Sequence, residues 1–139
     1  MWKILVVDDN ASNRTLLTEL LQNVPTELLD GTAHCDEAAN GYDAFEEYKR
    51  AIEAAKPYDL LLLDIAMPDE SGIEVLKKIR EDESARGIES GRGVPIIMVT
   101  GYEDQFSAAV AHGCDDYILK PIDVGILVEK IAQKLKNSA

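Results

Sequence analysis

Short, purely apolar runs recur along the chain, separated by stretches whose apolar residues follow a helical period. Four of these runs contain little or no polar sequence, as expected for parallel strands buried on both faces. They cover residues 4–7, 60–63, 96–99 and 117–119. A weaker run at residues 33–38 predicts a further strand nearer an edge of the sheet.

Five intervening stretches carry apolar residues three or four positions apart, the spacing of one helix face. The stripes are Leu16, Leu17, Leu20, Leu21 and Val24; Ala44, Phe45, Tyr48 and Ile52; Ile73, Leu76 and Ile79; Phe106, Ala109 and Val110; and Val124, Leu127, Val128, Ile131 and Leu135. Asp123 is placed to cap the last helix, and Ser71-Gly72 opens the third. Strand and helix alternate five times, which predicts an α/β fold with one doubly wound, five-stranded parallel sheet flanked by helices.

Two connections are longer than this alternation requires. Residues 25–32 precede the second strand and residues 81–93 precede the fourth. The second connection holds three glycines among charged residues and predicts a mobile loop, to which we assign no role. The last helix is expected to end near Lys136, so that residues 1–139 form a single domain without an output domain.

Charge and composition narrow the choice of partners. The formal net charge of −12 disfavours direct binding to nucleic acid or to an anionic membrane, because both would be repelled. No apolar run is as long as a membrane span and no signal-type segment opens the chain, so we expect a cytoplasmic protein. Cys35 and Cys114 are far apart and lack metal-type spacing, which predicts two free thiols.

Candidate chemistry lies where the predicted strands end. Ligands of open α/β sheets bind outside the carboxyl ends of the strands. The residues at those ends are Asp8 and Asp9, Asp64, Thr100 and Lys120, from four different strands. Each of them alone has an ordinary explanation as a helix cap or a surface lysine. Together they place three carboxylates, a hydroxyl and an ammonium at one edge of the sheet.

These groups suit phosphoryl transfer. Three clustered carboxylates repel one another unless a cation joins them, and oxygen-only ligands suit Mg²⁺ (or Mn²⁺). Lys120 can neutralise further negative charge, and the Thr100 hydroxyl can bond to a phosphoryl oxygen. Since phosphoryl transfer depends on positioning and electrostatic stabilisation, we expect Asp64 to be a nucleophile that forms an acyl phosphate.

Four motifs in order carry a family resemblance that covers nearly the whole chain. They are Val6-Val7-Asp8-Asp9-Asn10, Leu63-Asp64-Ile65-Ala66-Met67-Pro68, Val99-Thr100-Gly101 and Leu119-Lys120-Pro121. With them the chain resembles the receiver domain of two-component response regulators, which has a flavodoxin-like (βα)5 fold. The run Asp8-Asp9-Asn10 with Asn13-Arg14 is similar to receivers found in hybrid sensor kinases as well as in free-standing regulators.

The resemblance implies a role for each site residue. Asp64 would be the phosphoacceptor. Asp9, Asp64 and the main-chain carbonyl of Ala66 would hold Mg²⁺, with Asp8 near the metal or acting through water. Thr100 and Lys120 would bind the phosphoryl oxygens, and the Lys120–Pro121 peptide bond is expected to be cis.

The resemblance also implies partners and a switch. The donor would be a phosphohistidine on a sensor histidine kinase or a histidine phosphotransfer protein. The domain would phosphorylate and dephosphorylate itself, as a switch rather than a turnover enzyme. Thr100 and Tyr117 would move together and alter the face of the fourth helix, fifth strand and fifth helix, which contacts a downstream protein. A monomer or a weak dimer is compatible with this scheme.

Some positions depart from the family pattern. Ala66 cannot bond to an attacking water through its side chain and Tyr102 is bulky, so we expect slow self-dephosphorylation. Ser71 stands where the family often has an aspartate, which affects only a turn and a cap. Ala66 also argues against an aspartyl-phosphate hydrolase, which usually needs a second acid there, and Asp8-Asp9-Asn10 would repel the phosphate of a flavodoxin cofactor.

One alternative stays open at this point. A degenerate receiver can act as a phosphorylation-independent interaction scaffold. Such receivers usually lose an acid, the threonine or the lysine, whereas this chain keeps them all.

Overall fold

The computed structural model describes residues 1–101 and 103–137, so Tyr102 lies outside the described residues. Five parallel strands form one sheet in the order β2-β1-β3-β4-β5. The strands are β1 (Trp2–Val7), β2 (Ala33–Ala38), β3 (Leu60–Leu63), β4 (Ile96–Thr100) and β5 (Asp116–Leu119). The predicted fold class is confirmed, and β2 lies at an edge as expected.

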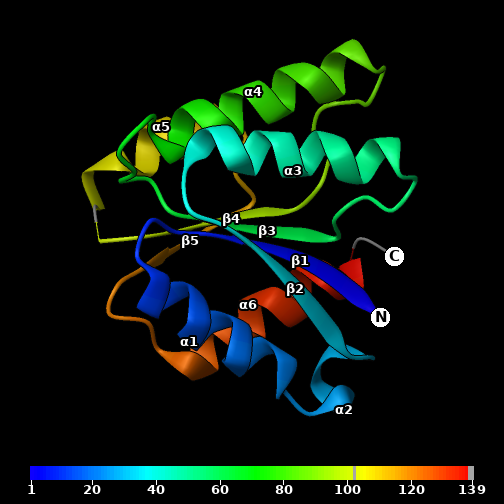
Figure 1. The fold of residues 1–139 in the computed structure, drawn as a ribbon, viewed down its shortest axis with the longest axis vertical. Helices are drawn as coiled ribbons and strands as arrows, with labels where there is room; N and C mark the ends of the chain where they lie inside the picture. The colour runs from blue at the N-terminus through cyan, green and yellow to red at the C-terminus, as the bar shows by residue number, and fades with distance from the viewer. Residues whose placement is uncertain (102, 138–139) are drawn as a thin grey trace.

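Helices cover both faces of the sheet (Figure 1). One layer contains α1 (Ala11–Gln22), α2 (Thr26–Leu29) and α6 (Val124–Asn137), and the other contains α3 (Gly41–Glu53), α4 (Gly72–Ala85) and α5 (Phe106–Ala111). A single 3-10 turn, η1 (Glu103–Gln105), leads into α5. This is the layered arrangement that alternating strands and helices predict.

Alternate residues of each central strand enter opposite halves of the core. In β1, Leu5 and Val7 pack with α3 and α4, whereas Ile4 and Val6 pack with α1 and α6. Side chains of a strand point alternately to the two faces, so both sets must be apolar when both faces are covered. The unbroken apolar runs follow directly from this burial.

The predicted burial was wrong at β5. Leu119, the last residue of the edge strand β5, is 42% exposed. Several helix stripes were also too wide. The residues of these stripes that are about half exposed or more are Leu16, Phe106, Val110 and Val124. Each helix contacts the sheet along a narrower line, such as Leu17 and Leu21 in α1.

Residues 25–32 contain an unpredicted helix rather than a plain connection. This segment forms α2, whose Leu29 is buried against the α1 and α6 layer. The Trp2 indole Nε1 donates a hydrogen bond to the Leu29 carbonyl oxygen over 2.6 Å. The extra length therefore closes the end of the core beside β1.

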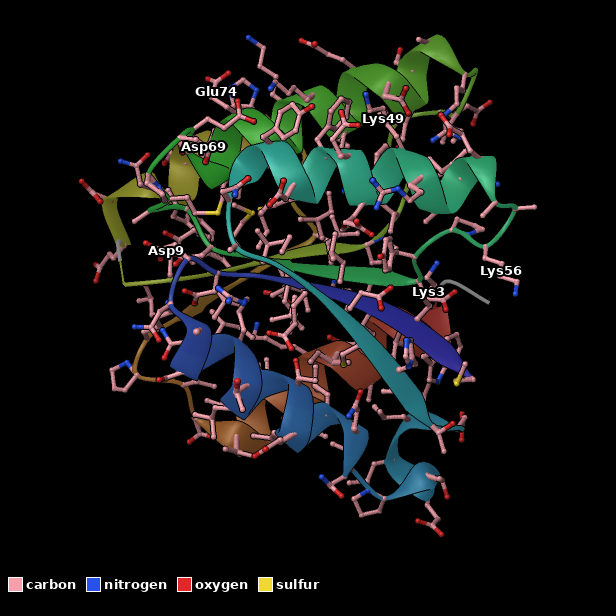
Figure 2. All side chains as sticks on the ribbon, in the orientation of Figure 1. Lys3, Asp9, Lys49, Lys56, Asp69 and Glu74 are labelled. Atoms are coloured by element: carbon pink, nitrogen blue, oxygen red, sulfur yellow. The ribbon has the colours of Figure 1, made fainter. Side chains whose placement is uncertain are left out.

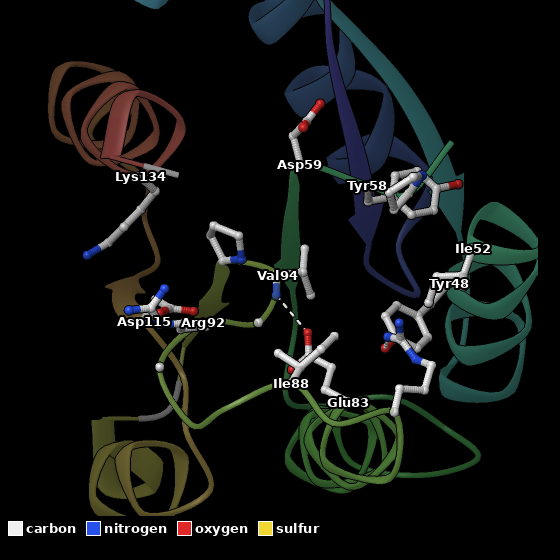
Figure 3. A pocket seen from close by; sticks show the side chains of 15 residues that line it. Tyr48, Ile52, Tyr58, Asp59, Glu83, Ile88, Arg92, Val94, Asp115 and Lys134 are labelled. Atoms are coloured by element: carbon white, nitrogen blue, oxygen red, sulfur yellow. Dashed lines mark hydrogen bonds between the residues drawn. The ribbon is translucent and has the colours of Figure 1, made fainter. Parts of the chain in front are cut away.

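The segment 81–93 also differs from the predicted mobile loop. Its first five residues belong to α4. The buried Glu83 carboxylate accepts hydrogen bonds from the Val94 backbone N–H and from Arg80, each over 2.7 Å, and so holds the rest of the segment (Figure 3). A cavity of about 720 Å³ lies here, lined by Tyr48, Tyr58 and Arg92 among others. Asp59 and Pro95, which precede β3 and β4, also line it, so the cavity lies at the end of the sheet opposite the predicted site.

Candidate functional site

The ends of β1 and β3 bring the predicted acids together. The chain passes from β1 to β2 on one side of β1 and then crosses to β3 on its other side, so the strand order reverses at β1. Backbone bonds fix the residues that follow: the Asp8 N–H donates to Ala38 O over 3.2 Å, and the Asp64 N–H donates to Val7 O over 3.0 Å. Ladder bonds therefore set where both carboxylates leave the sheet.

Three carboxylates form a cluster at this edge. Oxygen atoms of Asp8, Asp9 and Asp64 all lie within 4.8 Å of one another. Asp8 and Asp64 are 2% and 5% exposed, whereas Asp9 is exposed to solvent. The sequence placed all three at this edge of the sheet, and the structure brings them together.

Lys120 reaches the same cluster from the end of β5. Its backbone N–H donates to Thr100 O over 2.8 Å, and its Nζ lies 2.9 Å from Asp8 Oδ2 and 3.3 Å from Asp64 Oδ2. Burial alone would lower the pKa of Lys120, but the contacts with Asp8 and Asp64 raise it above its ordinary value. Lys120 is therefore a fixed ammonium between the two buried acids.

Burial has the opposite effect on Asp64. It raises the pKa of this carboxyl; the charge of Lys120 works against the rise, and the charge of Asp8 adds to it. The Ala66 backbone N–H lies 3.4 Å from Asp64 Oδ1, a long hydrogen bond. The Asp64 carboxylate thus carries a charge that its surroundings only partly compensate, in a site open on the side of Asp9.

Hydrogen-bond donors from Asn10, Asn13 and Arg14 surround Asp8, and the sequence alone assigned no role to these donors. The Asn10 N–H donates to its Oδ1 over 2.9 Å, and Asn13 Nδ2 lies 3.4 Å from its Oδ2. The Arg14 guanidinium donates to the Asp8 main-chain oxygen over 2.7 Å and contacts Glu37 over 3.2 Å. The only sequence signal was the Asn13-Arg14 pair itself, one helical turn after the acids.

A second positioning contact holds the loop after Asp64. Both oxygens of Asp69 accept hydrogen bonds from the N-terminus of α3, from Gly41 N and Tyr42 N, each over 2.9 Å. The next helix is capped by Ser71, whose Oγ accepts from Ile73 N over 3.1 Å, as expected for a turn and cap. No sequence pattern indicated that Asp69 would bridge to α3.

Thr100 and Tyr117 lie on one face of the sheet. Thr100 is the last residue of β4 and is fully buried. Tyr117 pairs with Met98, two residues before Thr100, so the two side chains share a face. The Tyr117 ring packs edge-on against Phe106 with centroids 5.4 Å apart.

The Lys120–Pro121 peptide bond is cis.

The donor atoms suit a hard divalent cation. Three carboxylates supply only oxygen ligands, and their mutual repulsion makes a cation favourable at this position. Lys120 supplies one positive charge for two buried acids and leaves the exposed Asp9 without a contact to its ammonium. The residues therefore fit a site that takes Mg²⁺ or Mn²⁺.

Other features of the described chain agree with the sequence expectations. Cys35 and Cys114 are both free thiols. Within residues 1–101 and 103–137, no helix combines the length and the apolar character needed to cross a bilayer.

Comparison with known proteins gives a consistent result. Residues 4–132 match the family described as the response regulator receiver domain. The transcriptional regulatory protein ResD of Bacillus subtilis is 37% identical over 139 residues, which cover 99% of this chain and 49% of ResD. Hybrid signal transduction histidine kinase L of Dictyostelium discoideum is 37% identical over 97% of this chain and 7% of its own. The chemotaxis protein CheY of Halobacterium salinarum is 34% identical over 96% of each chain.

These coverages differ because the relatives differ in length. The chain spans about half of ResD and a small part of the hybrid kinase, but nearly all of the archaeal CheY. Among solved structures, a CheY-like receiver domain of Methanospirillum hungatei covers 99% of this chain and 96% of its own, with 28% identity and a TM-score of 0.77. The response regulator TrrA of Thermotoga maritima, in complex with Mg(2+)-BeF, covers 97% and 100%, with 32% identity and a TM-score of 0.72.

Proposed function

This chain belongs to the response regulator receiver domain family, and from that premise we propose that Asp64 accepts a phosphoryl group from a phosphohistidine donor. The observation that carries the proposal is the cluster of Asp8, Asp9 and Asp64 within 4.8 Å, with Lys120 bonded to two of the three. In this scheme the domain is a switch that acts on itself rather than a turnover enzyme.

The transfer exchanges one bond to phosphorus for another. A carboxylate oxygen of Asp64 attacks the phosphorus of a phosphohistidine whose other ring nitrogen carries a proton. The P–N bond breaks, its electron pair stays on the ring nitrogen, and an aspartyl phosphate and a neutral imidazole result. Asp64 must be ionised to attack. Because burial raises its pKa, the charge of Lys120 matters for keeping it ionised.

The cation site would consist of Asp9, Asp64 and the main-chain carbonyl of Ala66, with Asp8 near the metal or acting through water. When bound, Mg²⁺ or Mn²⁺ supplies charge neutralisation for the carboxylates and for the incoming phosphoryl oxygens. The exposed position of Asp9 supports this assignment, since it leaves that side of the cluster accessible. The complex of TrrA with Mg(2+)-BeF is a further reason to test magnesium first.

Lys120 and Thr100 would receive the phosphoryl oxygens. The Lys120 ammonium already lies 3.3 Å from Asp64 Oδ2, so a phosphoryl group on Asp64 would arrive beside it. Thr100 ends β4 next to β3, and its hydroxyl would donate to another phosphoryl oxygen after turning from its buried position.

The change at Thr100 would reach the surface through Tyr117. The face of α5, β5 and α6 carries exposed apolar side chains: Phe106, Val110 and Leu119 are 53%, 52% and 42% exposed. Phe106 contacts the Tyr117 ring, so a movement of Tyr117 would alter that face directly. We assign the downstream protein partner to this α5–β5–α6 face and the phosphoryl donor to a sensor histidine kinase or phosphotransfer protein.

Intact-mass spectrometry after incubation with phosphoramidate tests the proposal. The wild-type protein should gain one phosphoryl group in the presence of Mg²⁺ and none after chelation, while Asp64→Asn should gain none. A folded wild-type protein that gains no phosphoryl group with Mg²⁺ would instead support the alternative of a phosphorylation-independent interaction scaffold.

A further inference from the structure

Arg14 ties the acid pair at the end of β1 to the neighbouring strand. Its Nη1 donates to the Asp8 main-chain oxygen over 2.7 Å, while its Nε contacts Glu37 Oε1 over 3.2 Å. Glu37 lies in β2, one residue before Ala38, whose oxygen accepts the Asp8 N–H. Both polar groups of the Asp8 backbone are therefore bonded to β2, one directly and one through Arg14.

The bond to the Asp8 oxygen has a consequence for Asp9. The carbonyl of Asp8 and the nitrogen of Asp9 belong to one rigid peptide plane. A guanidinium that fixes this carbonyl therefore fixes the plane from which the Asp9 side chain extends. Asp9 is exposed, so packing gives its position little support.

The contact is built for two-point holding. The Arg14 side chain is only 17% exposed, and its planar fork bonds to a carbonyl and a carboxylate at once. A lysine carries the same charge but a single ammonium, and it cannot reproduce that fork. An arginine that only adds charge to the surface would need neither this burial nor contacts with both the Asp8 carbonyl and Glu37.

We propose that Arg14 is a positioning residue for divalent-cation binding, acting by holding the Asp8–Asp9 peptide plane. The inference rests on the proposed cation site and extends it to a residue outside the ligand set. Because second-layer partners of metal ligands typically contribute ten- to a hundredfold to metal affinity, loss of this contact should weaken Mg²⁺ binding about tenfold.

An electrostatic account predicts the opposite sign, which makes the proposal testable. Arg14 is a positive charge in contact with the Asp8 backbone, so removing it should strengthen Mg²⁺ binding if charge alone mattered. Arg14→Lys keeps the charge and should then have no effect. Holding the peptide plane requires that both Arg14→Ala and Arg14→Lys weaken binding.

The experiment is an NMR titration of the full chain with MgCl₂ at constant ionic strength, following the amides of residues 8–10 and 64–66. Arg14→Lys and Arg14→Ala are compared with wild type and with Arg50→Lys, a matched control at an arginine that is 68% exposed and pairs with Glu47 on its own helix. Circular dichroism and thermal unfolding confirm that each variant is folded. If Arg14→Ala does not fold, Arg14→Lys decides the question.

We expect the apparent dissociation constant for Mg²⁺ to rise about tenfold in Arg14→Lys and to stay within twofold in Arg50→Lys. Phosphorylation by phosphoramidate should then recover the wild-type rate at saturating Mg²⁺, because the chemical groups are intact. Unchanged binding in Arg14→Lys, or tighter binding in Arg14→Ala, overturns the proposal. A wild-type protein that binds Mg²⁺ but takes no phosphoryl group contradicts the proposed function alone, whereas one that binds no Mg²⁺ contradicts both.

Discussion

At the scale of single residues, the three carboxylates of the site carry more negative charge than the Lys120 ammonium can balance. Asp8 and Asp64 are buried side by side and share Lys120, while Asp9 completes the cluster. Separating charges from water is costly, so such an arrangement is stable only with close opposite charges. The site therefore favours the binding of a further positive charge. In the proposed function, the phosphoryl group would lie beside Lys120.

Removing the ammonium should slow phosphorylation without abolishing the fold. We predict that Lys120→Gln lowers the rate of Asp64 phosphorylation by phosphoramidate by about a hundredfold at saturating Mg²⁺, since one fixed stabilising group is typically worth that much. Lys130→Gln is the control, because Lys130 pairs with Asp116 away from the cluster. Mass spectrometry measures the phosphorylation rate of each variant. Equal rates for Lys120→Gln and Lys130→Gln would show that Lys120 plays no part in the transfer.

Asp116 should make folding stability depend on acid pH. Burial works to raise the pKa of Asp116, but the hydrogen bond from Lys130 over 2.7 Å and the bond from the Tyr117 N–H over 2.9 Å hold it below the usual 3.8. A lowered folded-state pKa gives stability that is present above the unfolded-state value and is lost as the pH falls through the folded-state pKa.

Asp116→Asn should therefore be less stable than wild type at pH 7 by at most about 1 kcal/mol, because the pair is only partly buried. Urea unfolding at a series of pH values from 7 downwards measures the difference in unfolding free energy between the two proteins. This difference should shrink as the pH falls below the unfolded-state pKa of Asp116. Glu89→Gln, at a carboxylate 81% exposed, should leave the profile unchanged. A difference that grows as the pH falls would contradict the sign of this shift.

At the scale of elements, the central strands could be predicted because burial on both faces leaves no choice of residue type. β3 has the predicted bounds. In the structure β1 begins two residues before the predicted start, and β4 ends one residue after the predicted end. The short helix α2 could not be predicted, since four residues are too few to show a period and Leu29 is buried by tertiary packing. The exposure of Leu119 likewise depends on strand order, which periodicity does not encode.

The connection 86–95 shows the same limit. Glycines among charges suggest mobility, but the buried Glu83 carboxylate that holds Val94 is eleven residues away in sequence from its partner. Gly93 approaches that carboxylate so closely that a β-carbon there would lie 2.0 Å from Glu83 Oε1. Gly93 thus permits a close approach of the backbone to a buried carboxylate.

Gly93→Ala should destabilise the domain. The added methyl group must displace the buried Glu83 carboxylate, which accepts hydrogen bonds from Arg80 and Val94. We therefore expect a loss of about 1–3 kcal/mol in the free energy of unfolding, the usual range for overpacking. Gly101→Ala is the control, because a β-carbon there meets no heavy atom within 4 Å. Chemical unfolding that shows the same stability for both variants would rule out the close contact.

At the scale of the whole molecule, the acid cluster and the large cavity lie at opposite ends of the sheet. The acid cluster lies at the carboxyl ends of the strands, and the cavity lies beneath residues 86–95. Phe106, Val110 and Leu119 are exposed apolar residues of α5 and β5. Figure 2 shows Asp9 and Asp69 toward one end of the molecule and Lys3 and Lys56 toward the other. In the proposed function, the change at Asp64 would reach the α5–β5–α6 face through Thr100 and Tyr117.

Phosphorylation should change that face selectively. We predict that amide hydrogen exchange in residues 103–119 changes on phosphorylation, whereas exchange in α3 does not, because α3 lies away from Tyr117 and its neighbours. Asp64→Asn treated identically is the control. If α3 and the α5–β5 region respond alike, a general change in stability rather than a directed switch is the better explanation.

Most of the candidate site could be predicted from the sequence, and for a physical reason. Strand ends in a parallel sheet converge on one edge, so Asp8, Asp9, Asp64 and Lys120 could be assigned to it before any coordinates. Arg14 and Asp69 could not, because each acts by holding backbone that is near only after folding. Residues that hold the backbone of the candidate site are therefore less visible in sequence than its clustered charged residues.

The most direct measurement locates the phosphoryl group on the chain. The protein is treated with phosphoramidate and Mg²⁺, the acyl phosphate is reduced with borohydride to homoserine, and the peptides are mapped by mass spectrometry. The account predicts homoserine at position 64 alone, and none without Mg²⁺ or in Asp64→Asn. Homoserine at Asp8 or Asp9, or phosphorylation that survives Asp64→Asn, would contradict the assignment of Asp64 as the phosphoacceptor.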